Sequence, residues 1–87
     1  MAELFITESL INTFMEHLRY DERSQGTVEK YVRDVKSFAR WIGGKAITKE
    51  LVADWKAELV GQKYSPSTIN SMLSALNKFF TWMGRLD

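Results

Sequence analysis

Apolar residues recur at three- and four-residue steps in four separate segments of the chain, and no segment alternates regularly between apolar and polar residues. Because residues three and four apart share one face of a helix, this spacing predicts helices over residues 7–22, 25–42, 48–61 and 66–83. The apolar positions are Leu10, Ile11, Phe14, Met15 and Leu18, then Val28, Tyr31, Val32, Val35, Phe38, Ala39 and Ile42, then Leu51, Val52, Trp55 and Leu59, and finally Ile69, Met72, Leu73, Leu76, Phe79, Phe80 and Met83. Since the loops are short, the pattern predicts an all-α bundle of four helices whose neighbours pack roughly antiparallel.

Polar residues, one proline and several glycines mark the ends of these segments. Residues with a short polar side chain favour the N-cap of a helix, proline suits its first position, and glycine favours its end. The expected N-caps are Ser24, Thr48 and Ser65, followed in the last case by Pro66, and the expected ends are Gly43 with Gly44, Gly61 and Gly84. The start and stop signals therefore agree with the apolar pattern.

The composition narrows the classes of protein that fit. The 87 residues are enough for one domain, spanning residues 1–87, with a single core. The absence of cysteine excludes disulfides, thiolate metal sites and cysteine nucleophiles, and the one histidine, His17, cannot form a zinc site alone. We therefore expect no metal and no cofactor. No apolar run approaches the roughly 20 residues that a bilayer requires, so we expect a cytoplasmic protein without a membrane span, monomeric in isolation.

Charge is distributed unevenly along a chain whose formal net charge is only +1. Residues 1–23 hold five acids and two bases, a net charge of −3, whereas residues 24–45 hold two acids and five bases, a net charge of +3. Residues 46–60 have a net charge of −1 and residues 61–87 a net charge of +2. The second and fourth predicted helices are therefore the basic pair.

The polar faces of these two helices have a composition that suits contact with nucleic acid. At about 100° per residue, the face opposite the apolar stripe holds Lys30, Arg33, Ser37 and Arg40 with Lys36 at its flank on the second helix, and Ser67, Ser71, Ser74, Lys78 and Thr81 with Asn70 and Asn77 beside them on the fourth. Cations displace counterions from phosphate, and small hydroxyl and amide side chains approach the DNA closely. Ser65, Ser67 and Thr68 also lie at a helix N-terminus, which favours a phosphate oxygen.

Two other interpretations of the same residues remain open at this point. The serine and threonine residues around Pro66 also fit a role limited to helix capping, and a basic helix beside acidic neighbours is common on solvated surfaces. Trp41 and Trp82 fall at the edges of their apolar stripes, where each can either cover the core or anchor a protein partner. A helical protein-interaction module is therefore the alternative to a nucleic-acid-binding module.

Three stretches in this order, "SQGTVEKYVRDVKSFARWI", "ITKELVADWKAEL" and "YSPSTINSMLSALNKFFTWM", resemble the core-binding, SAM-like N-terminal domain of the tyrosine recombinase (phage integrase) family. The family's threonine, tyrosine, aromatic and tryptophan positions match Thr27, Tyr31, Phe38 and Trp41. Its serine-proline-serine-threonine helix start matches residues 65–68, and its following apolar positions match Ile69, Leu73, Leu76, Phe79 and Phe80. The resemblance covers residues 10–83.

The resemblance implies a bundle that clamps one side of double-stranded DNA with its second and fourth helices, the pair that carries the positive charge. The candidate DNA contacts are Thr27, Lys30, Arg33, Lys36, Ser37 and Arg40 on the second helix, and Lys63, Ser65, Ser67, Thr68, Asn70, Ser71, Ser74 and Lys78 at the fourth. The hydroxyl of Thr27 has the alternative role of serving the first turn of its own helix. In the family the first helix often contacts a neighbouring protomer on DNA, so residues 10–18 are a candidate contact with other recombinase protomers.

Family members cut and rejoin DNA through a separate C-terminal domain, which supplies a tyrosine nucleophile and a cluster of arginine, lysine and histidine. Nothing after Met83 matches that domain, so we expect the catalytic domain to be absent and this chain alone not to act as an enzyme. Tyr31 lies on the apolar stripe, Tyr64 is placed to pack against Ile69, and Tyr20 lacks a matching cationic cluster, so none is a candidate nucleophile.

The sequence thus predicts a DNA-binding module of a site-specific recombinase, bacterial or phage-encoded and associated with the nucleoid. Its base-reading side chains are expected among Arg33, Ser37, Asn70, Ser71 and Lys78. If about four phosphates are neutralised, the binding constant should fall with salt at a log–log slope of about −3.6. The alternative stays a helical protein-interaction module whose basic face is incidental.

Overall fold

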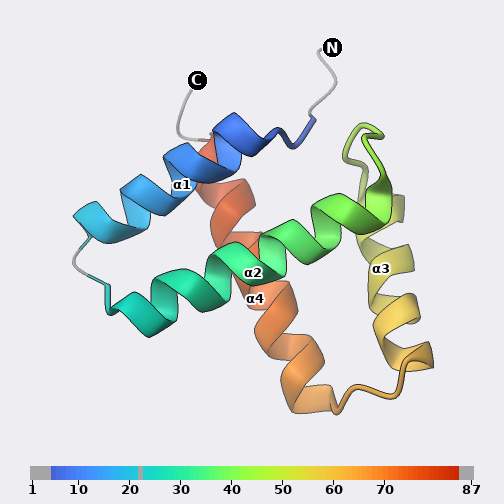
Figure 1. Cartoon of the computed structure of the whole chain (residues 1–87). Helices are drawn as coiled ribbons and strands as arrows, with labels where there is room; N and C mark the ends of the chain where they lie inside the picture. Colours follow the sequence, from blue (N-terminus) through green and yellow to red (C-terminus); the bar gives the residue numbers. More distant parts are fainter. Residues whose placement is uncertain (1–4, 22, 85–87) are drawn as a thin grey trace.

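Four α-helices make up most of the computed structural model, which describes residues 5–21 and 23–84. They are α1 (Glu8–Tyr20), α2 (Gln25–Ile42), α3 (Lys49–Gly61) and α4 (Pro66–Gly84), and no strand occurs among the described residues (Figure 1). The all-α prediction is confirmed. Within the same residues, no helix is both long and apolar enough to cross a membrane.

The helices begin where the sequence predicts, because a side-chain oxygen accepts an unused backbone N–H at each start. Thr7, Ser24 and Thr48 accept from the amides of Leu10, Thr27 and Leu51, and Ser65 Oγ accepts from the amide of Thr68 at 3.2 Å. The first helix is shorter than expected, since it ends at Tyr20 and not at residue 22, which lies outside the described residues.

The end of α3 departs from the expected mechanism. Gly61 is the last helical residue, but the left-handed residue that turns the chain is Lys63, with a φ of 65°. The amide of Lys63 donates to the carbonyl of Val60 at 3.0 Å, and that of Tyr64 to Leu59 at 3.3 Å, which is the Schellman arrangement. A side chain therefore occupies the position where glycine is usual, whereas Gly43, at the end of α2, follows the expected rule with a φ of 60°.

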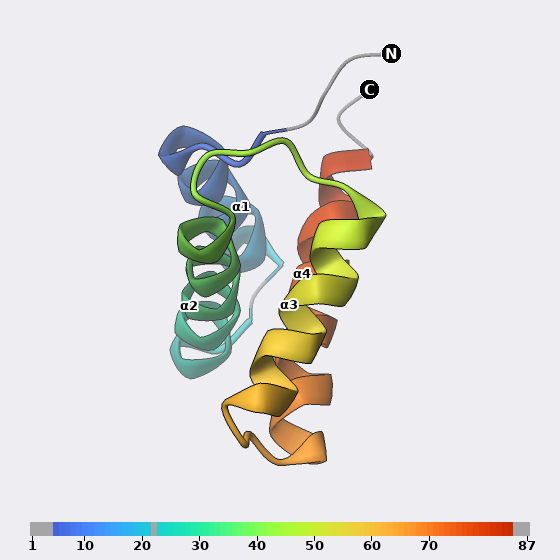
Figure 2. The ribbon, with the colours of Figure 1, turned by 90° about the vertical axis from the view of Figure 1, so that its right-hand side faces the viewer.

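The four helices form two layers, with α1 and α2 in one and α3 and α4 in the other (Figure 2). The chain reverses direction from α1 to α2 and from α3 to α4, as the short loops predict (Figure 1). In contrast, α2 and α4, which contact each other most extensively, cross face to face (Figure 1). Because each of these two helices buries its apolar side against the other, its polar side faces outward beside the contact.

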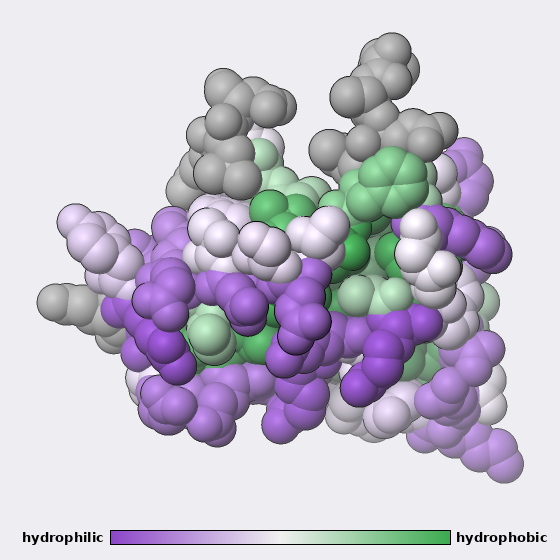
Figure 3. Space-filling model, turned by 45° about the horizontal axis from the view of Figure 1, so that its top comes forward, coloured by the Kyte–Doolittle hydropathy of each residue, from purple (hydrophilic) through white to green (hydrophobic). Residues whose placement is uncertain are grey.

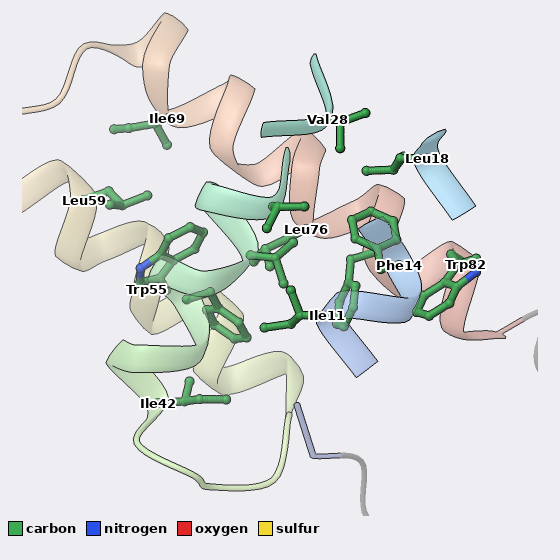
Figure 4. Close-up of a cluster of buried hydrophobic side chains, with 14 residues drawn as sticks. Ile11, Phe14, Leu18, Val28, Ile42, Trp55, Leu59, Ile69, Leu76 and Trp82 are labelled. Carbon is green, nitrogen blue, oxygen red and sulfur yellow. The ribbon is translucent and has the colours of Figure 1, made fainter. Parts of the chain in front are cut away.

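An aromatic cluster holds the layers together. The rings of Phe14 and Phe79 meet edge to face with centroids 5.1 Å apart, and Phe38 meets Trp55 at 5.2 Å. Trp82 contacts Phe14 at 5.3 Å and is only 7% exposed, so it covers the core (Figure 4). All four helices contribute a buried ring to this cluster. Of the two tryptophans considered as partner anchors, only Trp41, at 37% exposed, stays at the surface.

Replacement of a ring in this cluster will test the packing. Phe38→Ala removes a completely buried side chain, so the free energy of unfolding should fall by about 3–5 kcal/mol, measured by urea denaturation. Val60→Ala on α3, where the side chain is 58% exposed, is the matched control and should change stability by less than about 0.5 kcal/mol. Equal effects of the two substitutions would contradict the assignment of the core.

The unusual end of α3 gives a second prediction. An added Cβ at Gly61 meets no atom within 4 Å and its φ is not in the left-handed region, so Gly61→Ala should raise the free energy of unfolding by about 0.5–1 kcal/mol. Gly43→Ala, at a left-handed position, is the control and should lower it. A loss of stability in Gly61→Ala would show that Gly61 is the residue that turns the chain. Thermal denaturation followed by circular dichroism measures both variants.

Candidate nucleic-acid interface

A groove between α2 and α4 brings candidate residues from both basic helices together. Its volume is about 480 Å³. Six residues predicted as DNA contacts line it, namely Lys30, Arg33 and Ser37 from α2 and Ser67, Thr68 and Ser71 from α4. The remaining lining residues are Asp34, Tyr64 and Met72. The helices that the charge distribution selects are therefore neighbours in space, and their polar sides form one surface.

The first turns of α2 and α4 have the same hydroxyl arrangement. Ser24 Oγ donates to Thr27 Oγ1 at 2.8 Å, and Ser65 Oγ donates to Thr68 Oγ1 at 3.0 Å. In each pair the serine also accepts from the threonine amide, at 3.2 Å. The serine hydroxyls are thus committed to capping, whereas each threonine hydroxyl keeps its own proton for a further acceptor. Thr27 Oγ1 thus takes part in the first turn of its own helix by accepting from Ser24, and its role as a DNA contact stays a prediction.

Lys30 lines the groove and binds a backbone carbonyl of α4, a contact that its position in the sequence does not predict. Its Nζ donates to Asp34 Oδ2 at 2.6 Å and to the carbonyl oxygen of Ser71 at 3.0 Å. The Asp34 side chain is 7% exposed and that of Lys30 is 31% exposed. Nζ also lies 5.6 Å from the centroid of the Tyr31 ring. Two of the three ammonium donors are therefore engaged within the protein.

Arg33 differs from Lys30 in being exposed, and it lies where two hollows meet. It lines the α2–α4 groove and also a hollow of about 260 Å³ between α1 and α2. Lys36, Arg40 and Arg19 line that second hollow as well. Exposed cations therefore continue from the groove along the outer side of α2, and the exposed carboxylate of Glu29 lies among them in the second hollow. Asp34 is the acidic residue among those that line the groove, and the ammonium of Lys30 balances its charge.

Other predicted contacts lie away from the groove. Lys78 lines a separate groove of about 310 Å³ between α1 and α4, together with His17 and Arg23. Asn70 and Ser74 are exposed on α4, and Lys63 and Ser65 are exposed in the α3–α4 connection. The helical projection placed Lys78 and Ser71 on the same polar face of α4. In the fold, the part of that face at Ser71 lies beside α2, whereas the part at Lys78 lies beside α1.

Three residues near this surface were not singled out from the sequence. Asp34 is buried, Met72 lines the groove, and the Arg23 guanidinium lies 5.7 Å from the centroid of the Tyr31 ring. The i,i+4 spacing of Lys30 and Asp34 is a usable signal for their ion pair. No local signal indicates that this pair faces α4, because that depends on how the helices cross.

Exposed apolar side chains give the alternative class of function weak support. Phe5, Tyr20, Trp41, Val60 and Tyr64 are the large exposed apolar residues of the described ranges, and they belong to different elements. Hydrophilic side chains cover most of the face in Figure 3, with hydrophobic atoms showing between them. Trp82, one of the two anchors considered, is part of the core. Trp41 and Tyr64 line one small hollow of about 190 Å³ with Trp55, Leu59 and Met72, and this hollow is the part of the surface that fits the protein-interaction alternative.

Comparison with known proteins defines the class. Residues 11–85 match the family described as phage integrase, N-terminal SAM-like domain, and the chain belongs to this family. It is also similar to a protein of Caldanaerobacter subterraneus subsp. tengcongensis named "Putative tyrosine recombinase TTE1313", with 29% identity over 84 residues. The similarity covers 90% of this chain and 29% of that protein's length. No solved structure matches the chain.

Proposed function

We propose that this chain is the DNA-binding module of a site-specific tyrosine recombinase, and that α2 and α4 clamp a core recombination half-site. The observation that carries the proposal is the α2–α4 groove, where six candidate residues from the two basic helices meet. The proposal also agrees with membership of the integrase N-terminal family. Its substrate is double-stranded DNA, and other recombinase protomers bound to the same DNA are its expected partners.

The residues of the groove have the two properties that duplex binding requires. Arg33 is exposed and can reach phosphate or the edge of a guanine, which arginine contacts with two donors. Ser67 and Ser71 are small enough to let α4 approach the DNA backbone closely. Because the carboxylate of Asp34 is buried and paired, it adds little repulsion toward phosphate.

Base reading is assigned to side chains near the exposed rim of the groove. Arg33, Ser37 and Ser71 line the groove, and Asn70, next to Ser71 in sequence, is exposed on α4. Lys78, which lines the other groove, is proposed as a phosphate contact at the end of the footprint. We assign strand cleavage to a catalytic region of the whole recombinase outside residues 11–85, because these residues match the N-terminal domain of the family.

The salt dependence of duplex binding is the first prediction from this function. If about four phosphates are neutralised, the log–log slope of the binding constant against salt should be about −3.6, and Arg33→Ala should make it shallower by about 0.9. Fluorescence anisotropy with a short labelled duplex measures both. Lys56→Ala removes an exposed cation from α3 that lines neither the groove nor the hollows beside it, and is the control that should keep the slope. A slope near zero for the unaltered protein would refute the DNA-binding proposal.

Mapping the bound surface gives the second prediction. In a titration of the isotope-labelled domain with a short duplex at low salt, backbone amide signals of residues 27–40 and 63–78 should shift, and the shifts should fade as salt rises. Arg33→Ala with Lys78→Ala should weaken these shifts without unfolding the bundle, because both side chains are exposed. Shifts confined to α1, α3 or the surroundings of Trp41 would favour the protein-interaction alternative.

A further inference from the structure

One side-chain hydrogen bond in the described residues joins two different helices. Lys30 Nζ on α2 donates to the carbonyl oxygen of Ser71 on α4, across 41 positions of sequence. The other side-chain hydrogen bonds of this part of the chain all join residues three or four positions apart. The remaining contact between α2 and α4 is packing of side chains, which has no fixed direction. The bond from Lys30 is therefore the directional link in this crossing.

Asp34 holds Lys30 in the position that this link requires. Its carboxylate is almost fully buried, and a buried charge is costly unless a partner of opposite charge and hydrogen bonds compensate it. At 2.6 Å the Lys30 ammonium supplies both. Because departure of the ammonium would leave a buried carboxylate without its ion-pair partner, the ammonium stays between Asp34 and Ser71.

The link lies inside the groove that binds DNA under the proposed function. Lys30 and Asp34 flank Arg33 in sequence, three positions before it and one after it, and all three line the groove. Ser71 lies one helical turn after Ser67 on the opposite wall. A bond from Lys30 to Ser71 therefore sets how far Arg33 stands from the serine side of α4.

We propose that Lys30 and Asp34 form an internal strut that fixes how α2 crosses α4, so that Lys30 is a positioning residue and not a phosphate contact. This inference rests on the proposed function, because the groove it fixes is the one assigned to DNA. It gives a required role to Asp34, the acidic residue among those that line the groove. It also changes the role that the sequence predicted for Lys30.

The direction in which one substitution changes the affinity for duplex DNA separates this proposal from a purely electrostatic effect. Asp34→Asn keeps the shape of the side chain and removes its charge. If charge alone matters, loss of an anion near phosphate strengthens duplex binding. If Asp34 positions Lys30, the strut opens and binding weakens, by roughly threefold to tenfold. Asp54→Asn, which removes an exposed carboxylate from α3, is the matched control. Tighter binding by Asp34→Asn at equal helicity would overturn the proposal.

The salt slope tests whether Lys30 touches phosphate. Lys30→Met should weaken binding as Asp34→Asn does while keeping the log–log slope of the unaltered protein. A phosphate contact at Lys30 would instead make the slope shallower by about 0.9, as expected for Arg33→Met. The double variant Asp34→Asn with Lys30→Met should be no weaker than either single variant, because both changes break one unit. A shallower slope for Lys30→Met overturns the positioning role.

A measurement on the free protein, without DNA, tests the strut independently of the proposed function. In the free protein, Asp34→Asn should shift the carbonyl carbon of Ser71 and the amides of residues 67–75, whereas Asp54→Asn should leave them in place. Unchanged α4 signals would overturn the strut even if DNA binds. Absence of duplex binding by every variant and by the unaltered protein would refute the proposed function, while the α4 shifts still decide whether the strut exists.

A second variant covers the case in which Asp34→Asn does not fold. Lys30→Met with Asp34→Leu removes both charges, leaves the net charge at +1 and buries no charge without a partner, and such replacements usually keep the fold. It should bind duplex DNA as weakly as Lys30→Met. Binding equal to that of the unaltered protein would show that the groove does not need the strut.

Discussion

The packing of α2 across α4 is the contact on which the rest of the molecule depends. Val35 and Phe38 of α2 and Leu76 and Phe79 of α4 are at most 1% exposed, and α1 and α3 complete the core by adding Phe14 and Trp55 to the same cluster. A domain of this size buries a modest share of its surface, so a few large rings supply much of its stability. A large change in how α2 crosses α4 would therefore disrupt the core.

The same crossing creates the groove. Because each helix buries one side in the core, its polar side turns outward, and where α2 and α4 cross the two polar sides meet along a shared edge. Packing alone tolerates small changes of crossing angle, since apolar contacts have no direction. The bond from Lys30 to Ser71 adds direction, and the buried carboxylate of Asp34 keeps the ammonium from turning toward solvent. Stability and the shape of the groove thus have different sources.

Features that depend on neighbouring residues were predictable from the sequence, and features that depend on the crossing were not. The caps at Ser24 and Ser65 and the four apolar stripes are local, so spacing and residue type were enough to place the helices. Lys63 at the end of α3 was missed because glycine nearby gave a stronger local signal for a left-handed residue. The separation of Lys78 from the groove was missed because a projection treats each helix alone, without the helices that cover it.

Asp34 shows what a count of charges along the chain does not register, namely which charges are paired inside the fold. In the count, Lys30 and Asp34 cancel and leave the second helix basic, which remains true in the folded chain because the two form an ion pair. In this pair the carboxylate is buried and the ammonium is held inside the groove, so under the proposed function the cations that meet phosphate are those outside it, such as Arg33, Lys36 and Arg40. An apolar pair could fill the same space with similar stability. An apolar pair has no donor that could bind the carbonyl oxygen of Ser71. Under the proposal, the hydrogen bond from the Lys30 ammonium to this oxygen is what sets the width of the groove.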